Sequence, residues 1–325
     1  MAKLGDYVKI RTGKLDANAS SESGQYPFFT CAIEPLKIDS YSYDCECVLV
    51  AGNGDLNVKY YSGKFDAYQR TYIIESMDKT FLDVQYLYFF MDKYLETLRS
   101  QSIGGVIKYI KLGNLTEADI FIPSIERQRE IVQILRKSRE LISLRKQQLA
   151  KLDELVKARF VEMFGDPVVN SKRWSVETIE NHIDLLTGFP FDSSGYVSKG
   201  VNICGGLIIM PQKIDWSACK HWPQITGYED YILRPNDIVI ALDRPWISNG
   251  FKIAMVDREH LPALLIQRTA RIRAVDINQH YLMQSLLLGR FDKHCNITGS
   301  LVPHISPKDI KSYSVMIPPI ELQNQ

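Results

Sequence analysis

The feature that most constrains this chain is an uninterrupted stretch from Ser124 to Met163 that contains neither proline nor glycine. Its apolar residues recur at spacings that are sums of three and four, at Ile131, Leu135, Ile142, Leu149, Leu152, Val156 and Met163. This period predicts one long α-helix with a coiled-coil-type seam, started by Pro123-Ser124 and stopped by Gly165-Asp166-Pro167. About 39 residues at ~1.5 Å each give a rod of about 58 Å, which is typical of a spacer rather than of a compact core.

The segments on either side of this helix are rich in predicted strands. Short β-branched and aromatic runs bounded by turn residues lie at Asp44–Ala51, Lys59–Tyr61, Thr71–Glu75, Asp237–Leu242 and Phe251–Val256. Amphipathic stretches at Val84–Arg99 and Gln279–Lys293 predict one short helix on each side. The 325 residues are 45% hydrophobic and 24% charged. These values fit two packed domains of about 150 residues each and exclude disordered or collagen-like chains.

An internal repeat relates the two sides. The run Ile122-Pro123-Ser124-Ile125-Glu126-Arg127-Gln128, which opens the helix, returns 195 residues later as Ile317-Pro318-Pro319-Ile320-Glu321-Leu322-Gln323. Further matches keep the same order: Tyr86-Leu87 with Tyr281-Leu282, Gly104 with Gly299, Ile110 with Ile305, Gln69-Arg70-Thr71 with Gln267-Arg268-Thr269, and Thr12-Gly13 with Thr187-Gly188. A colinear set of this kind is typical of a duplicated domain.

The predicted fold class is therefore α/β (α+β), with two duplicated domains joined by a long coiled-coil-type helix. We expect the first domain at residues 1–123, the central helix at 124–164 and the second domain at 165–318. Residues 319–325 are expected to be the start of a second long helix.

The sequence offers no catalytic or metal-binding constellation. Gly13-Lys14 and Gly63-Lys64 lack the upstream glycine and the following hydroxyl of a phosphate loop. No Gly-x-Ser-x-Gly elbow or His-Glu-x2-His helix occurs, and the six cysteines contain no Cys-x2-Cys pair. No apolar run approaches the ~18 residues that a membrane span requires. We predict a cytoplasmic protein with reduced thiols, no metal, no cofactor and no catalytic residues of its own.

The central helix carries a local charge excess. Between Arg127 and Arg159 there are ten basic and four acidic residues, although the formal net charge of the whole chain is only +1. A basic stripe along DNA and an ordinary solvated helix face both explain this pattern, and the charge alone does not separate them.

Taken together, these motifs resemble a known family. Duplicated strand-rich domains, each closed by Ile-Pro-x-Ile-Glu-x-Gln at the start of a long helix, resemble the DNA-specificity (S) subunit of type I restriction-modification systems. The helix ends in Ala158-Arg159-Phe160-Val161-Glu162-Met163-Phe164-Gly165-Asp166-Pro167, and Gly299-Ser300-Leu301-Val302-Pro303-His304-Ile305 resembles the Gly-(Ser/Thr) segment before the last strand of each recognition domain.

The resemblance implies a non-catalytic subunit with two target-recognition domains, each reading one half of a split site in double-stranded DNA. It implies two kinds of protein partner, namely modification subunits that methylate adenine and restriction subunits that translocate and cut. Two rival functions remain open: a free-standing DNA methyltransferase or nuclease, and a coiled-coil scaffold with no DNA role. Methyl transfer by the chain alone would favour the first rival, and a lack of salt-dependent DNA binding would favour the second.

The repeat also divides the candidate DNA contacts into residues that are repeated in both domains and residues that are not. Because the two halves of a split site normally differ, residues repeated in both domains serve the fold or the phosphates, and non-repeated polar loop residues are the better base readers. Arg and Lys suit guanine and Asn suits adenine. The candidates are Asn53, Lys59, Lys64, Lys108, Tyr109, Arg244, Trp246, Asn249, Lys252 and His304.

The second long helix, expected to begin at Pro319, is cut short by the end of the sequence at Gln325. The resemblance implies that such a helix pairs with the central one. We therefore expect an exposed helix seam that contacts a partner: a second copy of the chain, a modification subunit or a separately encoded helix. The predicted contact residues are Ile131, Leu135, Ile142, Leu149, Leu152 and Val156.

Overall fold

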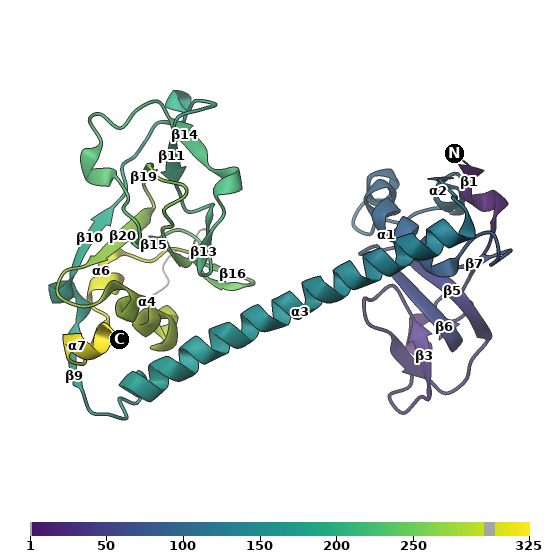
Figure 1. The fold of residues 1–325 in the computed structure, drawn as a ribbon, viewed down its shortest axis with the longest axis horizontal. Coiled ribbons are helices and arrows are strands. Elements are labelled where there is room, and N and C mark those ends of the chain that lie inside the picture. Colours follow the sequence, from purple (N-terminus) through teal and green to yellow (C-terminus); the bar gives the residue numbers. More distant parts are fainter. Residues whose placement is uncertain (1, 296–302) are drawn as a thin grey trace. The chain divides into compact units, whose positions relative to one another are not determined.

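The computed structural model describes residues 2–295 and 303–325. It divides into two compact units, Met1–Gln148 (unit 1) and Leu149–Gln325 (unit 2), and the division falls inside the long helix α3, Ile125–Phe164 (Figure 1). Both units combine sheets with helices, which confirms the predicted fold class. The finer division at residues 123, 164 and 318 stays a prediction, although α3 begins and ends within one residue of the expected limits.

Unit 1 is built on a six-stranded sheet in the order β2-β7-β5-β6-β3-β4. Its elements are β1 (Ala2–Lys3), β2 (Val8–Thr12), β3 (Tyr26–Phe29), β4 (Leu36–Ile38), β5 (Tyr43–Ala51), β6 (Val58–Ala67), β7 (Thr71–Ser76), α1 (Val84–Gln101), α2 (Leu112–Thr116) and β8 (Asp119–Ile120). Helix α1 buries residues spaced three and four apart, Val84, Leu87, Met91, Leu95 and Leu98. Asp83 caps it by accepting from the amides of Gln85 and Tyr86.

Unit 2 repeats this plan, with shorter counterparts of β5 and β6. Its elements are β9 (Ser175–Thr178), β10 (Ile183–Thr187), β11 (Val201–Cys204), β12 (Ile209–Met210), β13 (Lys213–Ile214), β14 (Lys220–Trp222), β15 (Ile238–Ala241), β16 (Trp246–Ile247), β17 (Gly250–Phe251), β18 (Ile253–Met255), β19 (Ala263–Leu265), β20 (Thr269–Ala274), α4 (Gln279–Leu288), α5 (Phe291–His294), α6 (Pro307–Lys311), β21 (Ser314–Ile317) and α7 (Ile320–Gln323). The order β10-β20-β15-β18 matches β2-β7-β5-β6 of unit 1. The parallel pair β11 with β19 matches β3 with β6.

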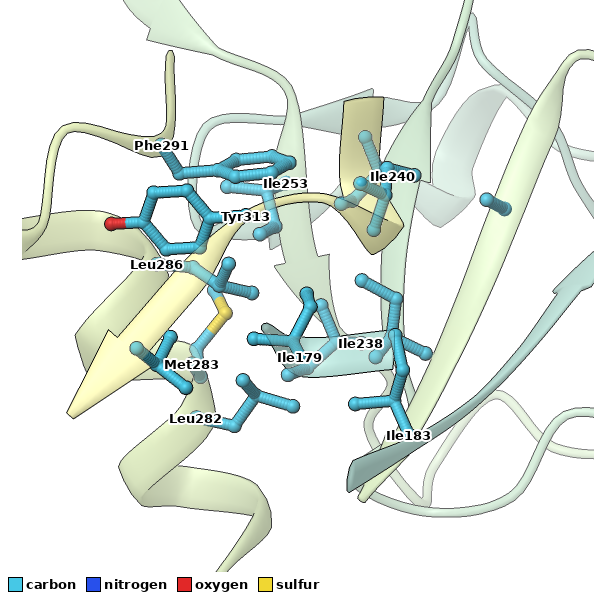
Figure 2. Close-up of a cluster of buried hydrophobic side chains, with 14 of the residues drawn as sticks. Ile179, Ile183, Ile238, Ile240, Ile253, Leu282, Met283, Leu286, Phe291 and Tyr313 are labelled. Carbon is cyan, nitrogen blue, oxygen red and sulfur yellow. The ribbon is translucent and has the colours of Figure 1, made fainter. Parts of the chain in front are cut away.

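The main core of unit 2 lies between this sheet and α4. Figure 2 shows the side chains that fill it, with Ile238 and Ile240 of β15 across from Leu282, Met283 and Leu286 of α4. Phe291 and Tyr313 close one side, with their ring centroids 5.1 Å apart in an edge-on arrangement. Core packing of this kind fixes the sheet on which the candidate loops are mounted.

Two predicted elements are broken in the structure. The helix expected at Gln279–Lys293 is two helices, α4 and α5, because Gly289 and Arg290 interrupt it and Arg290 has a left-handed backbone (φ 60°). The strand expected at Phe251–Val256 is divided between β17, which pairs with β16, and β18, which pairs with β15. In both places, the apolar pattern continues across a residue at which the backbone changes direction.

The seam of α3 is mostly exposed in the structure. Its exposed apolar side chains include Leu135, Ile142, Leu149, Leu152 and Val156, whose exposed fractions run from 37% to 63%. Ile131 is half-buried at the start of the helix. At the other end, Phe160 and Phe164 are buried against Tyr281 of α4.

Candidate nucleic-acid interface

The site begins where β5 ends in unit 1. The amide of Gly52 donates to the carbonyl of Arg70 (2.8 Å), and the amide of Ile110 donates to the carbonyl of Gly52 (2.9 Å). Two residues further, the amide of Gly54 donates to the carbonyl of Lys108 (2.9 Å), and Asn53, between the two glycines, forms a β-bridge with Tyr109. Two distant loops are thus held side by side by backbone bonds.

Unit 2 builds the same crossing from different residues. Leu242 donates to the carbonyl of Arg268 (2.9 Å), and Ile305 donates to the carbonyl of Leu242 (2.9 Å). Arg244 donates to the carbonyl of Pro303 (2.7 Å). Asp243 forms a β-bridge with His304. We call residues 52–54 with 108–110, and residues 242–244 with 303–305, the bridge loops.

The backbones of the bridge loops are equivalent but their side chains are not. Asn53 corresponds to Asp243, Gly54 to Arg244 and Tyr109 to His304. The structure therefore brings together the sequence-predicted candidates Asn53, Lys108 and Tyr109 in unit 1, and Arg244 and His304 in unit 2. The segment Gly299–Val302, which supported the family resemblance, lies outside the described residues, as does the match of Gly104 with Gly299.

The remaining candidates of unit 2 lie on and beside the hairpin of β16 and β17. Trp246 packs on Phe251 (ring centroids 4.9 Å apart), and Asn249 is exposed in the turn. Lys252 is buried, with 6% of its surface exposed, and its Nζ donates to the carbonyl of Gly206. Burial, together with the nearby charge of Arg244, lowers the pKa of Lys252.

Lys252 has a structural counterpart in unit 1. The backbone carbonyls of Lys252 and Asn57 accept equivalent bonds from Ala241 and Ala51. The Nδ2 of Asn57 donates to the carbonyl of Cys31 (2.8 Å), as Lys252 does to that of Gly206. Both side chains tie a neighbouring loop to the sheet. The ammonium of Lys252 is thus buried and already bound, and its contact with a base stays a prediction.

The two lysine candidates on β6 lie away from the bridge loops. Lys59 donates to Oδ1 of Asn57, and burial lowers the pKa of Lys59. Lys64 lies over the ring of Tyr41, with its Nζ 4.7 Å from the ring centroid. Because the two residues are five positions apart on one strand, they point to opposite faces of the sheet. Lys59 and Lys64 therefore do not form one cluster with each other.

The repeated residues build the scaffold beneath the bridge loops. The carbonyls of Arg70 and Arg268 accept the first bond of each crossing. Gly13 and Gly188 pack so closely that an added Cβ would lie 2.1 Å from the carbonyl oxygen of Ala67 in unit 1 and 2.0 Å from that of Ile266 in unit 2. Both positions therefore require glycine.

Sequence reasoning found the repeated glutamine of the helix-start motif but not its role. Gln128 is fully buried, and its Oε1 accepts from the amide of Asp83 (2.9 Å). Its Nε2 donates to the carbonyls of Phe81 and Pro123 (2.8 Å each). Gln323 repeats the arrangement, with Oε1 accepting from Asn278 (2.8 Å) and Nε2 donating to the carbonyl of Pro318 (2.7 Å). This glutamine fastens the first turn of α3 in unit 1, and α7 in unit 2, to the N-cap of the helix that covers the sheet.

The structure adds two findings about other kinds of site. Across residues 2–295 and 303–325, no three His, Cys, Asp or Glu side chains are grouped so that they could hold a metal ion. None of the helices in these residues is long and apolar enough to cross a membrane. The six cysteines are free thiols.

Comparisons with known proteins show what this chain is similar to. The family model described as "Type I restriction modification DNA specificity domain" matches residues 1–154. The type I restriction enzyme EcoDI specificity subunit of Escherichia coli is 37% identical over 155 residues, 48% of this chain and 34% of that protein. The chain therefore spans about a third of that relative's length.

Two further relatives extend over almost the whole chain. The type I restriction enzyme MjaVIII specificity subunit of Methanocaldococcus jannaschii is 23% identical, covering 99% of this chain and 83% of that protein. The crystal structure of a type I restriction-modification system S subunit from M. genitalium has the same fold, with a TM-score of 0.61 at 15% identity over 99% of this chain and 86% of that one. Residues 1–154 thus match the type I restriction-modification DNA-specificity domain, and the chain as a whole is similar to type I restriction enzyme specificity subunits.

Proposed function

We propose that this chain selects the DNA target of a type I restriction-modification complex by reading a split site, one half with each unit. The observation that carries the proposal is the pair of bridge loops, in which one backbone arrangement presents different side chains. A duplicated scaffold with unlike side chains is what two unlike half-sites require. Arg70 and Arg268, repeated and positioned beside the bridge loops, are suited to phosphate contacts.

In the proposed complex, recognition of DNA and the chemical reactions belong to different subunits. The chain supplies recognition, while modification subunits methylate adenine and restriction subunits translocate and cut the DNA in the cytoplasm. The exposed seam of α3 supports a role in assembly, because an apolar stripe on an otherwise charged helix favours a packed partner. The basic residues of α3 suit it to lie near the DNA backbone.

An exchange of one unit tests the proposal. Residues 1–122 are replaced by the corresponding segment of a relative, and the methylated motif is sequenced in cells that also make the modification subunits. One half of the motif should change and the other should stay the same. A motif that changes in both halves, or in neither, would contradict reading by separate units.

Incubation with labelled S-adenosylmethionine and DNA tests the non-catalytic role. The chain alone should transfer no label, and label should appear only when modification subunits are added. Transfer by the purified chain would instead identify it as a methyltransferase.

A further inference from the structure

Arg244 has a backbone conformation that arginine seldom adopts. Its φ is 45°, in the left-handed region, and it directly precedes Pro245. A side chain with a Cβ is strained in this region, and a following proline favours extended backbone instead. The conformation is nevertheless fixed, because the amide of Arg244 donates to the carbonyl of Pro303 (2.7 Å) and Pro245 is buried.

The equivalent residue of unit 1 shows what the scaffold itself requires. Gly54 has φ 70° and donates to the carbonyl of Lys108 (2.9 Å), as Arg244 does to that of Pro303. Glycine adopts this conformation without strain. Unit 1 thus carries the residue that the backbone favours, and unit 2 carries arginine at the same point despite the strain. Arg268 and Arg290 also have left-handed backbones, so the strain alone does not single out Arg244. The exchange of glycine for an exposed arginine at an equivalent point of the scaffold is what points to a role for the side chain.

The Arg244 side chain has no partner that would explain its presence by the fold. It is exposed, and no other described residue hydrogen-bonds or ion-pairs with its guanidinium. The neighbouring carboxylate of Asp243 is bound instead by Nη1 of Arg268 (3.0 Å). The nearby charge of Arg244 helps to lower the pKa of Lys252, whose Nζ already donates to the carbonyl of Gly206. Among the described residues, the guanidinium donors of Arg244 are therefore unused.

A guanidinium fork matches the O6 and N7 acceptors of guanine in the major groove. Resting on the proposed function, we infer that Arg244 is a specificity-determining residue of unit 2 that reads a guanine in its half-site. Unit 1 has no such contact from the equivalent position, because Gly54 has no side chain. The two halves of the target then differ at this point for a structural reason.

The test compares the full chain with single variants, each assembled with its modification subunits. Bound sequences are selected from a pool of random duplexes, and affinities for the wild-type target are measured. In R244G, one guanine of one half-site should lose its selection, with the rest of the motif unchanged. Affinity for the wild-type target should fall about 5-fold to 100-fold, the range expected for one lost bidentate contact. R244K keeps the charge without the fork and should lose part of the preference.

Controls separate base reading from charge and from folding. R258A removes one positive charge from another exposed position of unit 2 and should leave the motif unchanged. The Tm of R244G should equal or exceed that of the wild type, because glycine relieves the strain. A lowered Tm, or a uniform loss of affinity with an unchanged motif, would overturn the inference by making Arg244 structural or a phosphate contact.

The reciprocal variant is G54R. An added Cβ at Gly54 meets no atom within 4 Å, so the side chain has room. G54R should gain a guanine preference at one position of the other half-site. If R244G loses its guanine and G54R gains none, the assignment of Arg244 stands and the equivalence of the two positions is overturned. A wild-type chain that selects no sequence rejects the proposed function itself, whereas a split motif that R244G reproduces base for base rejects only this inference.

Discussion

At the scale of single residues, the buried polar side chains of this protein mostly bind backbone atoms. Gln128, Gln323, Asn57 and Lys252 each tie a loop or a helix start to the sheet through a carbonyl or an amide. A buried group that loses such a partner carries the full cost of its desolvation. These residues are therefore sensitive positions although none of them faces the candidate interface.

Replacing Gln128 with methionine should destabilise unit 1 by about 2–4 kcal/mol, because three backbone groups lose their partner in a buried place. Thermal and denaturant unfolding of the full chain would measure this loss. Gln147 is exposed on the same helix, so Gln147→Met is the matched control and should change stability by less than about 0.5 kcal/mol. A Gln128→Met variant as stable as this control would show that the tether contributes little.

Tyr281 gives a prediction about alkaline pH. Burial raises the pKa of Tyr281 to about 12 from its ordinary value of 10.0, and its hydroxyl donates to the carbonyl of Met316 (2.8 Å). Between these two values the unfolded chain loses the proton while the folded chain keeps it, so stability falls as pH rises. The part of this loss that belongs to Tyr281 should reach about 2–3 kcal/mol and be absent in Tyr281→Phe, while the part from Tyr313, whose pKa burial also raises to about 12, should remain. A stability difference between the two proteins that stays constant from pH 9 to 12 would contradict this account.

At the scale of elements, α3 is fastened at both ends and exposed between them. Gln128 holds its start in unit 1, and Phe160 and Phe164 hold its end in unit 2. The carbonyl of Phe164 accepts from Nε1 of Trp174 (2.9 Å), which closes the last turn. The stretch between carries the helix seam, and each Leu or Ile buried by a partner would contribute about 1.5–3 kcal/mol.

The double variant Leu149→Asp, Leu152→Asp tests the seam. If two copies pair through α3, the wild-type chain should form dimers in a sedimentation series up to tens of micromolar, and the variant should be monomeric. Both units should stay folded, because these side chains are 63% and 56% exposed. Gln148→Asp, Lys151→Asp adds the same acids beside the seam and should still dimerise. A wild-type chain that remains monomeric throughout would refute pairing between copies.

These elements could be predicted from local periodicity, whereas the pairing of residues far apart in the sequence could not. The period of three and four located α3, and the recurrence of one motif located the duplication. In contrast, the bridge of Asn53 with Tyr109 joins residues far apart in the sequence, and nothing near either residue signals it. Lys252 shows most clearly what local sequence cannot predict. A lysine in a polar loop pattern suggests DNA, and only the pairing of β15 with β18 shows that it replaces Asn57 as a buried tether.

At the scale of the whole molecule, the duplicated units have positions that carry the same residue in both units and positions that carry different residues, and the two kinds have different roles. Positions with the same residue, such as Gly13 with Gly188 and Gln128 with Gln323, maintain the backbone conformation that the two units share. Positions with different residues, such as Gly54 with Arg244, stand at equivalent points of that backbone. One scaffold can therefore present two unlike surfaces without two unlike folds.

An insertion in α3 tests whether this helix sets the spacing of the split site. Seven residues added after Ala150 keep the 3.5-residue register and add about 10 Å, or roughly three base pairs. The methylated motif should keep both halves and gain a longer unread spacer. Seven residues placed in the exposed loop at Gly227 serve as a control and should leave the spacer unchanged. An unaltered spacer in the α3 variant would refute the proposal that helix length measures DNA.

The hydrogen bonds of Gln128 affect how genes for such chains can recombine. Its partners, the amide of Asp83 and the carbonyls of Phe81 and Pro123, are all main-chain atoms. The amide of Asn278 and the carbonyl of Pro318, which bind Gln323, are main-chain atoms as well. A joint made only with main-chain atoms does not depend on the side chains of the domain that it joins. Genes that cross over within the Ile-Pro-x-Ile-Glu-x-Gln segment would rebuild this joint intact. Under the proposed function, new pairings of half-sites would then arise by recombination alone, with no mutation in the bridge loops.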